Sequence, residues 1–213
     1  MNILQTTDLK KYYGTEPNIT KALDGVTLSI EEGEFVAIVG TSGSGKSTLL
    51  NMMGGLDTPT SGSIKVKGKE LSKLKDEQLT IFRRRNIGFI FQNYNLVPVL
   101  NVYENIVLPV ELDGDTVDKR FMDEVVKMLA LDGKLNSMPN NLSGGQQQRV
   151  AIARALVSKP AIILADVNCT PIPLCLENRG FNGMYICVLC TFSLYVKSKQ
   201  IFSFQKSPLA FIY

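Results

Sequence analysis

The stretch Gly40-Thr-Ser-Gly-Ser-Gly-Lys-Ser-Thr48 decides how the rest of the chain is interpreted. Its two outer glycines are followed directly by Lys46 and Ser47, which fits the pattern GxxxxGK[ST]. In such a loop, backbone N–H groups surround the phosphates of a nucleotide. The apolar run before it is typical of a buried strand, and residues 46–53 after it are typical of a helix whose N-terminus faces the anion. The stretch therefore predicts a strand, a phosphate-binding loop and a helix.

The chain as a whole has the size of one α/β domain. Its 213 residues are enough for a sizeable core with a small inserted subdomain. Acidic and basic residues are interspersed, and the net charge of +3 gives no reason to propose nucleic acid as a partner. The N-terminus lacks a basic region followed by an apolar core, which predicts a cytoplasmic location.

Hydrophobic periodicity distinguishes an antiparallel part and a helical part from the α/β core. Residues 1–34 alternate as in an antiparallel sheet, whereas residues 93–158 have the pattern of helices and predict a helical subdomain inserted into an α/β core. The expected strands span 22–30, 35–39, 61–67, 87–91 and 161–165, and the expected helices span 46–53, 76–84, 102–108, 116–130 and 147–158. We therefore predict one α/β domain over residues 1–166.

A second loop precedes the last predicted helix, in the segment Asn141-Leu-Ser-Gly-Gly-Gln146. Ser143 is suited to cap the helix, so that Gly144 and Gly145 present free N–H groups at its start. This predicts a second anion site. Elsewhere, Tyr13 lies at a turn where it either stacks on a base or covers the edge of the sheet.

Residues 2–166 resemble the nucleotide-binding subunit of an ABC transporter. The resemblance rests on the phosphate loop, Gln92, the signature Leu142-Ser-Gly-Gly-Gln146 and the apolar strand that ends in Asp166, in this order. Three further stretches resemble the branch that serves lipoprotein, macrolide and antimicrobial-peptide exporters: Leu56-Asp-Thr-Pro-Thr-Ser-Gly62, Phe89-Ile-Phe-Gln-Asn-Tyr-Asn-Leu96 and Gly144-Gly-Gln-Gln-Gln-Arg-Val-Ala-Ile-Ala-Arg-Ala-Leu156. The implied fold is a phosphate-loop ATPase core with an antiparallel β subdomain and a helical subdomain.

The resemblance implies ATP and Mg²⁺ as cofactors, and no other metal is expected. Ser47, Gln92 and Asp166 would hold Mg²⁺, with Gln92 and Asp166 in catalytic roles. Tyr13 would stack on adenine. The expected nucleotide contacts are Tyr13, Gly40, Ser42, Gly43, Gly45, Lys46, Ser47, Thr48, Ser143, Gly144, Gly145 and Gln146. Ser143 and Gly145 would reach the ATP of an opposing subunit, so that two ATP-binding subunits, identical or different, enclose two nucleotides. A membrane permease would hold them at the inner face of the membrane and export a substrate.

The chain departs from the family pattern directly after Asp166. The family continues with a glutamate that polarises the attacking water, but this chain has Val167, and it contains no histidine to act as the later switch residue. Loss of a general base typically slows a reaction by about 10²–10⁴-fold. We therefore expect Mg-ATP binding with impaired hydrolysis. The alternative is a truncated pseudo-ATPase that only binds nucleotide or a partner, or a product that does not fold.

Residues 167–213 differ in character from the rest of the chain. They hold all four cysteines, eight of the seventeen aromatic residues and one acidic residue. Cys187 and Cys190 form a CxxC, but no second pair or histidine accompanies it, which argues against zinc. Three interpretations are open: an out-of-frame or recombined tail, membrane contact by residues 183–196, or a strand at 184–190 that replaces a missing core strand. Fourteen residues are short of the roughly 20 that a helical span needs.

Overall fold

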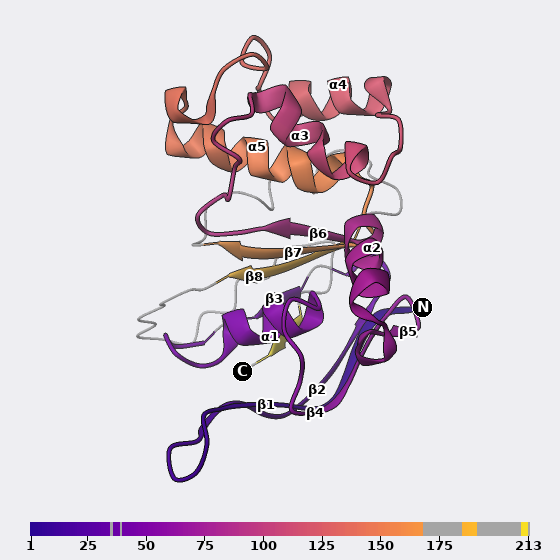
Figure 1. Cartoon of the computed structure of the whole chain (residues 1–213), viewed down its shortest axis with the longest axis vertical. Helices are drawn as coiled ribbons and strands as arrows, with labels where there is room; N and C mark the ends of the chain where they lie inside the picture. Colours follow the sequence, from indigo (N-terminus) through magenta and orange to yellow (C-terminus); the bar gives the residue numbers. More distant parts are fainter. Residues whose placement is uncertain (35, 39, 168–184, 191–209, 213) are drawn as a thin grey trace.

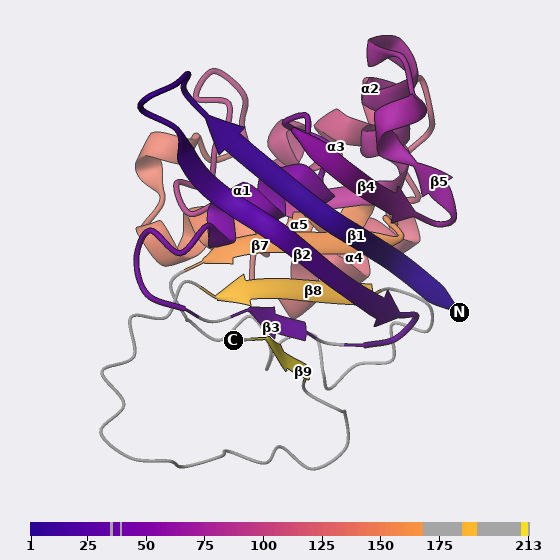
Figure 2. The same ribbon diagram turned by 90° about the horizontal axis from the view of Figure 1, so that it is seen from below.

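The computed structural model describes residues 1–34, 36–38, 40–167, 185–190 and 210–212. Figure 1 shows three layers: a helical layer at the top, a parallel sheet in the middle and an antiparallel sheet below. Helix α1 (Lys46–Met53) lies between the two sheets, as the view from below in Figure 2 also shows. This is the α/β architecture that the sequence predicts.

The antiparallel sheet has the strand order β2-β1-β4-β5. Its strands are β1 (Asn2–Tyr13), β2 (Thr20–Glu31), β4 (Ser61–Val66) and β5 (Lys69–Glu70). Apolar residues of β1, β2 and β4 are buried in one cluster with Leu49, Leu50, Met52 and Met53 of α1. Burial of each such side chain contributes about 1.5–3 kcal/mol, so this cluster fixes α1, and with it the loop at its start, against the sheet.

The parallel sheet has the order β6-β7-β8-β3-β9. It comprises β6 (Ile87–Ile90), β7 (Ile162–Val167), β8 (Tyr185–Cys190), β3 (Val36–Ile38) and β9 (Ala210–Ile212). In β7, Ile163 and Ala165 pack into the helical layer, whereas Ile162 and Leu164 pack into the cluster around α1. A strand buried on both faces explains the uninterrupted apolar run in its sequence.

Strand β8 occupies the position between β7 and β3. It pairs in parallel with β7 from Ile162↔Tyr185 to Val167↔Cys190, and with β3 at Val36↔Cys187 and Ala37↔Val188. Without it, the facing backbone groups of β3 and β7 would lose partners at about 1–3 kcal/mol for each buried group. Residues 185–190 thus form the strand that the sequence predicts at 184–190, while the out-of-frame or recombined tail stays a prediction. The remaining predictions for 168–184 and 191–209 concern segments outside the described residues.

The helical layer contains α3 (Val102–Glu111), α4 (Lys119–Met128) and α5 (Gly144–Val157), and α2 (Asp76–Asn86) precedes β6. Short 3₁₀ turns span Leu71–Lys73 and Pro139–Asn141. The expected end of a helix at 108 is wrong, because α3 continues through Pro109 to Glu111. The expected start at 116 is also wrong, because Asp118 caps α4 by accepting a hydrogen bond from the N–H of Phe121.

Candidate nucleotide-binding site

The phosphate loop joins β3 to α1, as its flanking sequence predicts. Gly45 caps α1 with a φ of +86°, and a Cβ there would lie 2.3 Å from the carbonyl oxygen of Ala22, so only glycine fits. Lys46 is only 8% exposed, and its Nζ donates hydrogen bonds to the carbonyls of Gly40 (2.9 Å) and Thr41 (2.6 Å) and to Ser44 Oγ (3.2 Å). The ammonium group is thus held within the loop, whose Ser42 and Gly43 are exposed.

Asp166 meets the phosphate loop at the carboxyl edge of the parallel sheet. Ser47 Oγ donates a hydrogen bond of 2.9 Å to Asp166 Oδ2, across a separation of 119 residues. The other carboxylate oxygen, Asp166 Oδ1, is buried and has no hydrogen-bond partner among the residues that the structure describes. Gln92 follows β6, whose Ile90 pairs with Ala165. Parallel pairing therefore brings Gln92 and Asp166 to the same edge.

The oxygen atoms at this edge fit a magnesium ion. Mg²⁺ prefers hard oxygen ligands and usually keeps several waters while binding one or two carboxylates and substrate phosphates. The hydroxyl of Ser47, the amide of Gln92 and the orphaned oxygen of Asp166 provide that chemistry. A bound cation would also satisfy the buried Oδ1 atom, which otherwise carries a desolvation cost.

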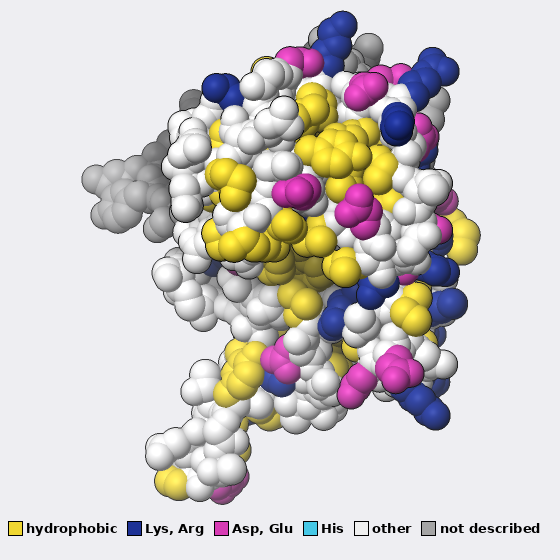
Figure 3. All heavy atoms as spheres, turned by 45° about the horizontal axis from the view of Figure 1, so that its top comes forward, with side chains coloured by type: hydrophobic (Ala, Val, Ile, Leu, Met, Phe, Trp, Pro, Cys, Tyr) yellow, Lys and Arg dark blue, Asp and Glu magenta, His cyan; other side chains and the backbone are white. Residues whose placement is uncertain are grey.

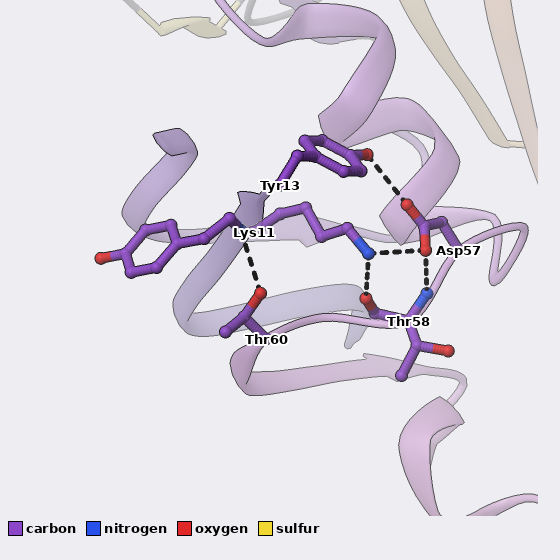
Figure 4. A network of polar contacts seen from close by, with 6 residues as sticks. Lys11, Tyr13, Asp57, Thr58 and Thr60 are labelled. Carbon is purple, nitrogen blue, oxygen red and sulfur yellow. Dashed lines mark hydrogen bonds and ion pairs between the residues drawn. The ribbon is translucent and has the colours of Figure 1, made fainter. Parts of the chain in front are cut away.

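Tyr13 lies at the end of β1, beside the phosphate loop. The residue is 43% exposed. Its hydroxyl donates a 2.9 Å hydrogen bond to Asp57 Oδ2, as Figure 4 shows. Partial burial raises the pKa of Tyr13, as does the hydrogen bond to Asp57, while a hydrogen bond with Thr48 acts in the opposite direction. Thr48 belongs to the first turn of α1, directly after the phosphate loop. The contact with Thr48 therefore places the Tyr13 side chain next to that loop.

The signature residues begin α5, and Ser143 is the N-cap that the sequence predicts. Ser143 Oγ accepts a hydrogen bond from the N–H of Gln146 (3.3 Å), and Gln146 Oε1 accepts one from the N–H of Ser143 (2.8 Å). This capping box leaves Gly144 and Gly145 exposed at the helix start. Helix α5 belongs to the helical layer, on the other face of the parallel sheet from α1. The signature and the phosphate loop are thus two separate elements of one chain, and anion binding at each of them stays a prediction.

Sequence reasoning missed the contacts that fix the loop after Gln92. Arg154 of α5 donates hydrogen bonds of 2.7 Å to the carbonyls of both Tyr94 and Asn95, and burial lowers the pKa of Arg154. Both loop residues have positive φ angles, 58° and 47°. Asparagine tolerates this conformation better than most residues, and that preference was the available sequence signal. Farther along, buried Asn105 bonds the backbone of Val97.

Fold and site together define a phosphate-loop nucleotide-binding protein. The strand, glycine-rich loop and helix are followed later in the chain by β7, two positions away in the same sheet, whose Asp166 accepts a hydrogen bond from the serine of the loop. Comparison with known proteins narrows this class. Residues 23–169 match the family described as ABC transporter, and the chain belongs to this family.

Similar proteins include two named as exporters. The macrolide export ATP-binding/permease protein MacB of Mannheimia succiniciproducens is 49% identical over 168 residues, which cover 78% of this chain and 26% of that protein. The bacitracin export ATP-binding protein BceA of Halalkalibacterium halodurans is 44% identical over 170 residues, covering 78% of this chain and 66% of that protein. The chain thus spans about a quarter of the first relative and about two thirds of the second.

A solved structure agrees with the fold. A dimeric ATP-binding cassette in a post-hydrolysis state bound to ADP and Pi is 40% identical, with a TM-score of 0.76, covering 88% of this chain and 87% of that one.

Proposed function

We propose that this chain is the ATP-binding subunit of an ABC exporter, and that it binds Mg-ATP but hydrolyses it slowly. The single observation that carries ATP binding is the Ser47–Asp166 hydrogen bond, which unites the phosphate loop with the aspartate predicted to hold magnesium. Family membership supports the ATPase class. The similarity to proteins named as macrolide and bacitracin exporters supports the direction of transport.

Each residue would act on the nucleotide through simple electrostatics. Lys46 would exchange its bonds to loop carbonyls for bonds to the β- and γ-phosphates. Ser47, Gln92 and Asp166 would hold Mg²⁺, which neutralises charge that develops on the phosphates. Gln92 would also orient the attacking water. At the end of β7, Val167 offers no group that accepts a proton, which is the reason to expect slow hydrolysis.

The proposed assembly is a pair of ATP-binding subunits on a permease. The exposed glycines at the start of α5 would face the ATP of a second subunit, and the dimeric cassette among the solved structures supports this arrangement. Val99 and Leu112 of the helical part are 77% and 62% exposed. Figure 3, which brings the helical layer forward, shows apolar side chains gathered on that face. Such surface suits a permease contact at the inner face of the membrane. In the part of the chain that the structure describes, no helix has the length and apolarity for a membrane span.

The activity proposal is tested with purified chain and Val167→Glu. We expect Mg-ATP binding by the unchanged chain, slow phosphate release, and release that Val167→Glu accelerates by about 10²-fold or more. Lys46→Ala is the control, because it should abolish both binding and turnover. Rapid turnover by the unchanged chain that Lys46→Ala removes would show that the proposal of slow hydrolysis is wrong.

A non-catalytic nucleotide binder is the second candidate, favoured by Val167 at the position of the missing glutamate. In that case Val167→Glu would bind ATP but release no additional phosphate. Both candidate functions require a folded chain that binds ATP. Far-UV circular dichroism during heating, with and without ATP, tests this requirement. A cooperative transition that ATP raises supports a folded binder, and a chain without any transition would contradict both.

A further inference from the structure

We propose that Asp57, held by Lys11, is a positioning residue that sets the ring of Tyr13 for stacking on the nucleotide base. The inference rests on the proposed function, because it assumes that Tyr13 receives the base of ATP. It concerns residues that neither the phosphate loop nor the signature includes. Its basis is the network of polar contacts drawn in Figure 4.

The network joins two distant segments of the chain. Lys11 and Tyr13 belong to β1, whereas Asp57 and Thr58 lie in the connection between α1 and β4. Tyr13 Oη donates to Asp57 Oδ2 at 2.9 Å, and Lys11 Nζ donates to Asp57 Oδ1 at 2.7 Å. Each oxygen of this carboxylate therefore holds one side chain of β1.

Additional bonds fix the carboxylate and the lysine themselves. The N–H of Thr58 donates to Asp57 Oδ1 at 2.7 Å, and the carbonyl of Thr58 accepts from Lys11 Nζ at 2.8 Å. Partial burial on its own raises the pKa of Asp57, but the hydrogen bonds from Lys11 and Tyr13 outweigh it and leave that pKa below its ordinary value. Asp57 is thus ionised at neutral pH and remains an acceptor for both partners.

The arrangement prepares one face of the Tyr13 ring. Lys11 Nζ lies 4.8 Å from the ring centroid, over one face, so that a base would stack on the opposite face. We call the contacts of Asp57 and Lys11 with Tyr13 the clamp. Without the clamp, the exposed tyrosine side chain would have to be ordered when the nucleotide binds. Ordering one side chain at an interface weakens affinity by about two- to twelvefold, which is the gain that the clamp provides in advance.

The experiment compares two ligands by isothermal titration calorimetry in the presence of Mg²⁺: ATP, which has a base, and inorganic tripolyphosphate, which has none. Asp57→Asn should weaken ATP binding by about three- to tenfold and leave tripolyphosphate binding unchanged. Tyr13→Ala should weaken ATP binding at least as much, and the double variant should be no worse than Tyr13→Ala alone. Asp57→Glu, which keeps the charge, should recover part of the loss.

Asp24→Asn is the matched control. Asp24 accepts a hydrogen bond from the hydroxyl of Tyr12, the neighbouring tyrosine of β1, so its loss alters a similar pair outside the clamp. This variant should bind both ligands as the unchanged chain does. Equal weakening of ATP and tripolyphosphate by Asp57→Asn, or unchanged ATP affinity, would overturn the inference while leaving nucleotide binding intact. An unchanged chain that binds neither ligand would instead contradict the proposed function.

Discussion

Replacement of Arg154 with methionine tests whether the signature helix holds the loop that carries Gln92. The guanidinium group donates to the carbonyls of Tyr94 and Asn95, both at 2.7 Å. A hydrogen bond from a charged group contributes about 1.5–3 kcal/mol. The bond to Tyr94 is partly shielded from water and should contribute this full amount. The bond to Asn95 is exposed and should contribute little. The expected loss is therefore about 2–3 kcal/mol.

For a chain of this size, each kcal/mol shifts the melting temperature by about 2–4 °C, so Arg154→Met should melt about 5–10 °C lower. Differential scanning calorimetry measures the shift, and hydrogen exchange of residues 92–96 should become faster. Arg120→Met is the control, because the Arg120 side chain is 92% exposed and forms a surface ion pair with Glu124 of the same helix at 3.4 Å. A transition of Arg154→Met within about 2 °C of the unchanged chain would refute the reasoning.

Three further changes have defined outcomes. Gly45→Ala should destabilise the chain by more than about 2 kcal/mol in urea unfolding and remove ATP binding, since the new methyl group meets the Ala22 carbonyl at a positive φ; a chain that still binds ATP would contradict this. Asn105→Leu should cost about 2–4 kcal/mol, because the buried amide bonds the backbone at Val97 and Leu100; an unchanged urea midpoint would count against it. A hydrogen bond from Lys159 lowers the pKa of Asp118. The ionised Asp118 side chain therefore stabilises the fold above pH about 3.9, and this stabilisation is lost as pH falls through the lowered pKa. Asp118→Asn should reduce the dependence of the urea midpoint on acid pH, measured by urea unfolding at several pH values.

Local sequence was sufficient to predict the elements at the proposed nucleotide site. Helix α1 begins and ends where its pattern predicts, and Ser143 caps α5 as expected. Both results follow from interactions within a few residues, namely the glycine conformation before Lys46 and the hydroxyl of Ser143 that satisfies a free N–H. The error at Pro109 has the opposite origin, because a local rule was overridden by tertiary packing. Proline removes one helical hydrogen bond, but packing of α3 in the helical layer keeps the helix intact to Glu111.

The sequence by itself determined the class of ligand, through the order of phosphate loop, signature and Asp166. Only the tertiary structure decided which distant residues meet: Ser47 with Asp166, Arg154 with the loop after Gln92, and Asp57 with Tyr13. It also placed β8 between β7 and β3. The physical reason is that these contacts depend on how sheets and helices pack, which no short window of sequence specifies, whereas a glycine-rich loop and a helix cap carry their geometry within their own few residues.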